Sequence, residues 1–152
     1  MRYTYIIIIT LIGIFTSNFV FAQMLSVKGN NVNLRSGPAR STSTHWEYDN
    51  GVPLQVLKKK GDWVQVADFE GDTGWIHKKL LCTAPHFIVT ANKKDRTKSI
   101  NIRQSPSTSA LIVAQAQYGV VFETLTTKKG WTQVRHSNGV EGWVSTSLLW
   151  GF

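Results

Sequence analysis

The sequence predicts an all-β protein built from two tandem small β-barrels of about five strands each. Residues 32–82 and 100–150 form a repeat. The two segments align without gaps, starting with Val32 opposite Ile100, and 16 of 51 positions are identical. Within each copy, apolar and polar residues alternate over short runs, turn-forming residues separate these runs, and no stretch has helical periodicity. Several short strands in a segment of roughly 60 residues can hide their edges only by curling into a small barrel.

Two strands are predicted in the first half of each copy. In the first copy, Val32 and Leu34 alternate with polar neighbours, and Ser-Gly-Pro at 36–38 ends this strand. The next strand follows Gly51 and runs to a lysine-rich hairpin tip at 58–62. The same features return in the second copy, with serine in place of glycine in the first turn, at Ser105.

The second half of each copy contains the remaining strands. Alternating residues at 63–66 predict a strand, and Phe-Glu-Gly-Asp at 69–72 predicts the turn after it. Gly74 then opens the last strand. In the second copy the corresponding turn holds Asn138 and Gly139, a pair typical of a two-residue hairpin.

The N-terminal segment 1–22 has the layout of a secretory signal peptide. Arg2 gives a short positive start, an apolar run follows, and small residues precede a predicted cleavage between Ala22 and Gln23. The rival interpretation, an uncleaved membrane anchor, is disfavoured because a spanning helix needs about 20 apolar residues. The predicted organisation is a signal peptide at 1–22, a first barrel at 23–82, a linker at 83–86 and a second barrel at 87–152.

Composition limits the classes of protein that remain. Cys82 is the only cysteine, so no intramolecular disulfide supports these small domains, which fits a bacterial envelope protein better than an animal extracellular module. Lys and Arg number 17 against 9 Asp and Glu, a formal net charge of +8. Such a chain attracts anionic polymers. Because secretion is predicted, we expect no nucleic-acid partner.

The residues resemble the bacterial Src-homology-3 (SH3b) family. Asn-Leu-Arg-Ser-Gly-Pro at 33–38, Gly-Asp-Trp-Val-Gln-Val at 61–66 and Gly-Trp-Ile at 74–76 follow the typical order of that family, and the second copy repeats it. The resemblance covers nearly all of the chain after the predicted signal peptide and implies two tandem SH3-like barrels. Ser105 departs from the family pattern, in which glycine is usual, so we expect the turn there to differ.

The resemblance also implies a shallow aromatic groove on each barrel. The matching positions are Trp63, His77 and Leu80 in the first copy, and Trp131, Ser145 and Leu148 in the second. The alternative for the two tryptophans is a packing role at the end of the barrel. By alternation, Ile76, Leu81, Val144 and Leu149 should lie in the cores.

Residues that differ between the copies are further candidates. Trp46 and Tyr48 stand where the second copy has alanines, and they either enrich the first groove or contact the other barrel. Lys78 and Lys79 follow the last strand of the first copy. A basic insertion at 91–99 contains Lys93, Lys94, Arg96 and Lys98. These cations are candidate contacts for carboxylates of a ligand.

No catalytic site, metal site or cofactor is predicted. Cys82 lies at the end of a barrel, where a cysteine is usually structural, and no catalytic context surrounds it or His86. The four histidines show no metal-ligand spacing. A hydrolase that SH3b domains often accompany would therefore be a separate chain.

The predicted function is that of a secreted, non-catalytic binding module in the bacterial periplasm or outside the cell. Its expected ligand is peptidoglycan peptide, or an extended peptide of an envelope protein, lying across Trp63 or Trp131. The alternative is a structural adaptor in an envelope complex or a targeting subunit for a separate cell-wall hydrolase. The sequence defines neither the binding copy nor the oligomeric state.

Overall fold

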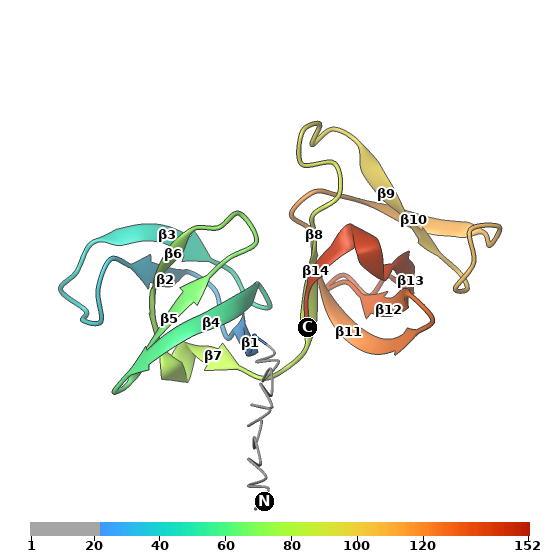
Figure 1. Cartoon of the computed structure of the whole chain (residues 1–152). Coiled ribbons are helices and arrows are strands. Elements are labelled where there is room, and N and C mark those ends of the chain that lie inside the picture. The colour runs from blue at the N-terminus through green and yellow to red at the C-terminus, as the bar shows by residue number, and fades with distance from the viewer. Residues whose placement is uncertain (1–21) are drawn as a thin grey trace, which may run out of the picture.

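A computed structural model describes residues 22–152, which form two β-sheet units joined by a short connection (Figure 1). The predicted signal peptide lies outside the described residues except for Ala22. The all-β prediction is confirmed, since the helical elements in the described range are two 3-10 turns, η1 (Lys78–Leu80) and η2 (Thr146–Leu148). Within residues 22–152 no helix has the length and apolar character needed to cross a membrane.

The first unit is an antiparallel sheet of seven strands in the spatial order β3-β2-β6-β5-β4-β1-β7. Its central strands are joined by hairpins, and β1 pairs with both β4 and β7, which brings the two ends of the copy together. The strands are β1 (Met24–Val27), β2 (Val32–Arg35), β3 (Thr44–Tyr48), β4 (Pro53–Lys60), β5 (Trp63–Ala67), β6 (Thr73–His77) and β7 (Leu81–Cys82).

The second unit repeats this topology in the order β10-β9-β13-β12-β11-β8-β14. Two tandem SH3-like domains are therefore confirmed, with seven strands each because the structure includes short closing strands such as the two-residue β7. The strands are β8 (His86–Val89), β9 (Ser99–Arg103), β10 (Ile112–Gln117), β11 (Val121–Lys128), β12 (Trp131–Arg135), β13 (Glu141–Ser145) and β14 (Leu149–Gly151).

Each unit has its own core, and the alternation in the sequence predicted its members. On β5, Val64 and Val66 are buried whereas Trp63 and Gln65 are half-buried on the other face. Ile76 and Leu81 lie in the first core, and Val144 and Leu149 lie in the second, as predicted. The cores leave the face that carries Trp63 free for other contacts.

Gly74 is required where β6 crosses β2. A Cβ atom at this position would lie 2.6 Å from Leu34 Cγ and 2.8 Å from the Arg35 carbonyl oxygen. Gly142 meets Ile102 and Arg103 at the same distances in the second unit. The Gly-Trp motif of each copy therefore reflects close packing of two strands.

Two turns differ from their predicted form. Around Ser105 the backbone bonds from Ser107 N to Ser105 O and from Ala110 N to Ser107 O match those of the first copy, so the expected difference at this turn is wrong. Serine fits because its counterpart, Gly37, has no positive φ. The turn at 136–140 is longer than a two-residue hairpin, because His136 N bonds Val140 O around a loop in which Gly139 has a φ of 91°.

The two units make polar and aromatic contacts across their junction. Ser26 Oγ donates to Ala84 O at 2.8 Å, and His86 Nδ1 lies 3.0 Å from Ser26 Oγ. His86 Nδ1 also lies 3.0 Å from Ala84 O. Because this carbonyl oxygen and the Ser26 hydroxyl, whose own hydrogen is already donated, can only accept, Nδ1 carries the hydrogen that the two oxygens share. The connection between β7 and β8 is thus hydrogen-bonded to β1 of the first unit.

Candidate functional site

Trp63 and His77 form an aromatic pair on the open face of the first barrel. They begin β5 and end β6, and they are direct partners across these two strands. Their ring centroids lie 5.4 Å apart with an interplanar angle of 78°, an edge-to-face contact. This register explains why two side chains from different strands share one site.

The turn after β6 adds an apolar side chain and a cation to this pair. His77 Nδ1 accepts the Lys79 amide at 3.3 Å, which shapes η1, and Leu80 is 40 % exposed beside it. A groove of about 440 Å³ results, which we call the Trp63 groove. It is lined by Asn30, Asn31, Val32, Asn33, Arg35, Arg40, Trp63, His77, Lys79 and Leu80.

The charge along the Trp63 groove is positive. Lys78 is engaged elsewhere, because its Nζ lies 2.8 Å from Asp62 Oδ1, a hydrogen bond that lowers the pKa of the Asp62 carboxyl. Arg35 donates to the Thr42 carbonyl at 2.8 Å and so braces the loop between β2 and β3. Arg35, Arg40 and Lys79 are therefore the cations that line the groove, and of these sequence reasoning identified Lys79 as a candidate contact.

The second barrel repeats the aromatic position with fewer cations, because of the three groove cations only Arg35 has a basic counterpart, Arg103. Trp131 pairs across the strands with Ser145, and Leu148 is half-buried against the second core. When the two copies are aligned, the counterparts of Arg40 and Lys79 are Thr108 and Ser147. The two predicted grooves thus differ in both aromatic content and electrostatics.

Trp46 and Tyr48 lie outside the Trp63 groove, so they do not enrich it. Tyr48 belongs to the first core, and its hydroxyl donates to Asp68 Oδ2 at 2.8 Å; burial, with this carboxylate, raises the pKa of the phenol. Trp46 is 53 % exposed and lines a separate cavity of about 460 Å³ together with Glu70 and with Arg96 of the second barrel. Tyr48 is thus a core residue of the first barrel, and Trp46 shares its cavity with one residue of the second barrel, Arg96.

The basic insertion contributes mainly to the junction. Lys93 Nζ and Arg96 Nη2 lie 2.7 and 2.8 Å from the carboxylate oxygens of Glu70, and the Tyr118 hydroxyl donates to this carboxylate at 2.6 Å. The hydrogen bonds from Lys93 and Tyr118 lower the pKa of the Glu70 carboxyl. We call this cluster the Glu70 clamp.

The predicted ligand-contact role of the insertion is therefore unsupported at Lys93 and Arg96, which are paired across the junction. Lys98 pairs within the insertion with Asp95 at 3.4 Å. Lys94 is exposed on the same loop. Desolvation and the Glu70 contact raise the pKa of Tyr118 to about 12, so its hydroxyl stays a donor in this clamp at neutral pH. Sequence reasoning missed Glu70 and Tyr118, because nothing in their spacing relates them.

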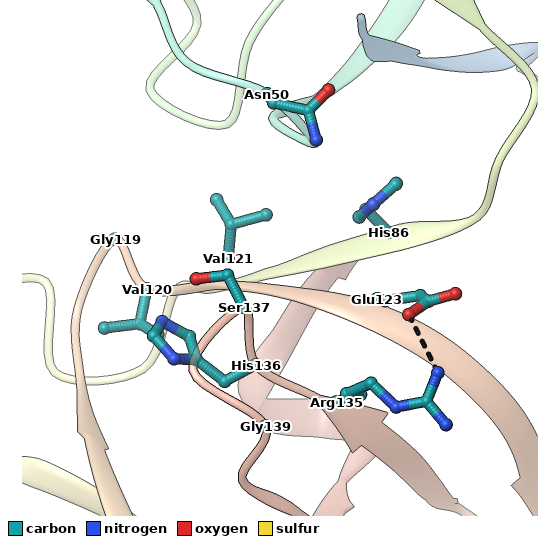
Figure 2. Close-up of a pocket in the computed structure, with 10 residues that line it drawn as sticks. All are labelled: Asn50, His86, Gly119, Val120, Val121, Glu123, Arg135, His136, Ser137 and Gly139. Atoms are coloured by element: carbon teal, nitrogen blue, oxygen red, sulfur yellow. Dashed lines mark hydrogen bonds and ion pairs between the residues drawn. The ribbon is translucent and has the colours of Figure 1, made fainter. Parts of the chain in front are cut away.

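A further cavity of about 590 Å³ lies at the junction, between Asn50 of the first barrel and residues of the second (Figure 2). His86 and His136 both border it. Arg135 also borders it, but its guanidinium is paired with Glu123 at 3.3 Å and Glu141 at 2.6 Å. This cavity had no sequence signal, since its two histidines are far apart in the chain.

Among residues 22–152, no three or more His, Cys, Asp or Glu side chains lie close enough together to hold a metal ion. Cys82 is half-buried on β7, opposite Ser26 of β1. His86 directs its Nδ1 to Ser26 and Ala84. Cys82 and His86 therefore belong to the structural contacts around the junction of the two barrels.

The fold and grooves define a class of protein: a pair of small antiparallel barrels with an aromatic groove. The bacterial SH3 domain family matches residues 28–82 and 96–151. The chain belongs to this family, in two tandem copies.

A curated relative is the Bacillus subtilis (strain 168) protein named "Putative N-acetylmuramoyl-L-alanine amidase YrvJ", which is 26 % identical over 129 residues. The match covers 76 % of this chain but 24 % of that protein, so the chain spans about a quarter of its relative's length.

Two solved structures are similar at low identity. An NlpC/P60 family protein from Bacillus cereus ATCC 10987 aligns with a TM-score of 0.38 and 16 % identity, covering 84 % of this chain and 56 % of that one. The structure titled "Endolysin LysPBC5 CBD" aligns with a TM-score of 0.33 and 13 % identity, covering 84 % and 92 %.

Proposed function

We propose that the protein is a non-catalytic binding module that recognises carboxylate-bearing peptide of bacterial peptidoglycan through the Trp63 groove. The observation that carries this proposal is the combination of the edge-to-face Trp63–His77 pair with three cations along the same groove, of which Arg40 and Lys79 have no basic counterpart in the second barrel. An extended peptide would lie across the aromatic rings, and Lys79 and Arg40 would meet its carboxylates. Membership of the bacterial SH3 family supports a ligand of this kind.

The place of action that we propose is the bacterial periplasm or the outside of the cell. The signal-peptide pattern of residues 1–22 supports export. The amidase name of the curated relative supports a cell-wall context, because that name specifies an N-acetylmuramoyl-L-alanine bond. Any hydrolysis of the wall is proposed to belong to a separate partner chain that this module directs to its substrate.

Binding is proposed to be concentrated in the first barrel. The second barrel keeps Trp131 but has Ser145, Ser147 and Thr108 where the first has His77, Lys79 and Arg40. Arg103 is retained as the counterpart of Arg35, so a peptide carboxylate would find three cations in the first groove and one at the matching positions of the second. The second barrel can therefore serve as an internal control for binding by the first barrel.

The test is retention of the purified chain by peptidoglycan sacculi, with a stem peptide titrated in parallel by tryptophan fluorescence. Trp63→Ala is expected to weaken binding by a factor of about 30 or more, as for a central aromatic contact, whereas Trp131→Ala should retain it. Replacing Arg40 by Thr and Lys79 by Ser, the residues of the second copy, should each weaken binding by a factor of about 2–5 and reduce its salt dependence.

Circular dichroism of each variant verifies that it is folded. Absence of retention by the wild-type chain, or equal losses for the Trp63 and Trp131 variants, would contradict the proposed function.

A second candidate function is a structural adaptor in an envelope complex. The observation that favours it is Trp46, an aromatic side chain that is 53 % exposed near the junction of the barrels. A photo-cross-linker placed at this position in cells should capture a protein if the adaptor role is correct. Recovery of wall fragments alone would contradict it.

A further inference from the structure

One lysine lies directly opposite the groove tryptophan in both barrels. In the first barrel Lys60 of β4 is the cross-strand partner of Trp63, and in the second barrel Lys128 of β11 is the partner of Trp131. Directly opposed residues place their side chains on the same face of a sheet, with Cβ atoms about 4.5–5.5 Å apart. Both lysines are exposed. Each barrel thus presents a cation beside its tryptophan.

The turn that follows this lysine does not explain why both copies have it. When the two copies are aligned, residues 58, 59, 61 and 62 all differ from their counterparts, and Lys60 is the residue of this stretch that is unchanged. The turn conformations differ as well. The first turn has a positive φ at Gly61, of 59°, whereas the second has positive φ at both Lys129 and Gly130, of 48° and 80°. Two different turns therefore place the same residue type opposite the same tryptophan.

The barrel fold does not explain this lysine either. Arg35 and Arg103 also face outward and are identical in the two copies, but each donates to a carbonyl of the loop that follows it, at 2.8 and 2.7 Å. Lys60 and Lys128 form no ion pair within residues 22–152. Their charges are therefore available to a ligand.

The charged neighbours of Lys60 at the hairpin tip are directed elsewhere. The Asp62 carboxylate is held by Lys78 Nζ at 2.8 Å. Lys59 lies opposite the buried Val64, so its side chain leaves β4 on the other face of the sheet. Among residues 59–62, Lys60 is thus the one that offers an unpaired charge to the face that carries the groove.

In the first barrel, cations lie on both sides of the aromatic pair. Trp63 on β5 has Lys60 opposite it on β4 and His77 opposite it on β6. Past His77, Lys79 and Arg40 line the Trp63 groove. The order across the face is therefore a cation, two aromatic rings and two further cations.

A ligand on this row crosses the strands instead of extending the sheet. β5 pairs with β4 on one side and with β6 on the other, so it has no free edge. Neighbouring strands are about 4.7–4.9 Å apart, which separates Lys60 from His77 by about 10 Å. An extended peptide covers this distance with about three residues. Carboxylates that lie three to four residues apart therefore match the cations on the two sides of the rings.

We propose that Lys60 binds a second carboxylate of the ligand, so that the first barrel recognises a peptide with two carboxylates. One carboxylate would meet Lys60 and the other Lys79 and Arg40, while the peptide between them lies on Trp63 and His77. The inference rests on the function proposed for the Trp63 groove, and it adds the charge pattern of the ligand and its direction across the strands.

The second barrel is expected to distinguish such a peptide less well. Lys128 lies beside the tryptophan there, whereas Ser147 and Thr108 replace the two cations on the far side of the rings. Arg103 is retained, but its guanidinium donates to Ala110 O at 2.7 Å. Recognition of carboxylate in this barrel is therefore concentrated at Lys128.

The test uses the synthetic stem peptide N-acetyl-L-Ala-γ-D-Glu-L-Lys-D-Ala, whose two carboxylates are separated by a chain of about three residues. Four forms are compared: the unmodified peptide, the two forms amidated at one carboxylate, and the form amidated at both. Each is titrated into the whole chain by isothermal calorimetry at low salt. Each single amidation should weaken binding to the wild-type chain by a factor of about 2–5, as for an exposed ion pair.

Matched variants assign each carboxylate to its cation. Lys60→Gln should weaken binding of the unmodified peptide by a factor of about 2–5 and abolish the effect of one of the two single amidations. Arg40→Thr combined with Lys79→Ser should abolish the effect of the other. Lys59→Gln removes the same charge from the opposite face of β4, and it should change neither the affinity nor the effect of amidation.

Equal losses for Lys60→Gln and Lys59→Gln, or amidation effects that both persist in Lys60→Gln, would overturn the inference. If only one amidation weakens binding to the wild-type chain and Trp63→Ala removes binding, the two-carboxylate pattern is wrong and the proposed function stands. If no form of the peptide binds the wild-type chain, the proposed function is contradicted together with this inference.

Discussion

Replacing Glu70 by glutamine tests whether the two barrels stabilise each other. The Glu70 carboxylate accepts from Lys93 at 2.7 Å, from Arg96 at 2.8 Å and from the Tyr118 hydroxyl at 2.6 Å, and all three residues belong to the second barrel. Glutamine keeps the shape of the side chain but removes its charge. The substitution therefore weakens the contacts across the junction without opening a cavity.

The magnitude follows from the exposure of the three donors. The side chains of Lys93 and Arg96 are 57 % and 62 % exposed, so each ion pair is screened and belongs at the low end of about 0.2–1 kcal/mol. A hydrogen bond from Tyr118 to a charged group contributes about 1.5–3 kcal/mol, and the glutamine amide oxygen retains part of it. We expect Glu70→Gln to lower the free energy of unfolding by about 1–2 kcal/mol at neutral pH.

Urea unfolding across a pH series measures this loss. The contacts that lower the pKa of the Glu70 carboxyl stabilise the folded chain at pH values above the carboxyl pKa of the unfolded chain. That contribution is lost as the pH falls through the lowered folded pKa. The difference between the wild-type chain and Glu70→Gln should therefore be complete at neutral pH, disappear in acid and shrink at high salt.

The matched control is Asp62→Asn, which removes an ion pair with Lys78 inside the first barrel, where both partners are more than half exposed. Its effect should be smaller than that of Glu70→Gln. A double-mutant cycle with Tyr118→Phe should show a favourable coupling between Glu70 and Tyr118. Equal unfolding of the wild-type chain and Glu70→Gln at neutral pH, or a difference that persists in strong acid, would refute this reasoning.

Three substitutions in the first barrel test the fold. Gly74→Ala should lower the free energy of unfolding by about 2–3 kcal/mol, because its Cβ would lie 2.6 Å from Leu34 Cγ; unchanged thermal unfolding would contradict this clash. Gly61→Lys should cost no more than about 1 kcal/mol, because the counterpart Lys129 already has a φ of 48°; a larger loss in urea would show that the two tips differ. Tyr48→Phe should cost about 1–2 kcal/mol by leaving a buried carboxylate oxygen without its donor, and calorimetry showing no loss would place the hydroxyl outside the stabilising network.

Much of the fold could be predicted because its determinants are local. Alternation along 63–66 identified which valines are buried, and the duplicated Gly-Trp motif marked the strand that packs closely on β2. The turn at Asn138 was harder to predict, because the Asn-Gly pair also fits the longer loop that His136 and Val140 close. Short sequence signals identify a turn more reliably than they identify its length.

The candidate groove was predictable in part, for the same reason. Trp63 and His77 occupy directly opposed positions on neighbouring strands, so the resemblance to SH3b domains was sufficient to bring them together. Arg40 was missed because it reaches the groove from the loop between β2 and β3, whose path depends on the bond from Arg35 to the Thr42 carbonyl. Trp46, a candidate for this groove, lies at another cleft because its strand forms the edge of the sheet.

The sequence by itself determined the duplication, the barrel class of each copy and the strand faces, because these depend on residue order and on a two-residue period. Only the tertiary structure decided that the basic insertion contacts Glu70 of the other barrel, and that Tyr48 is a core residue whose hydroxyl donates to Asp68. The physical reason is that these contacts join side chains far apart in the chain. Their geometry is set by how two folded units pack, and no periodic pattern encodes that packing.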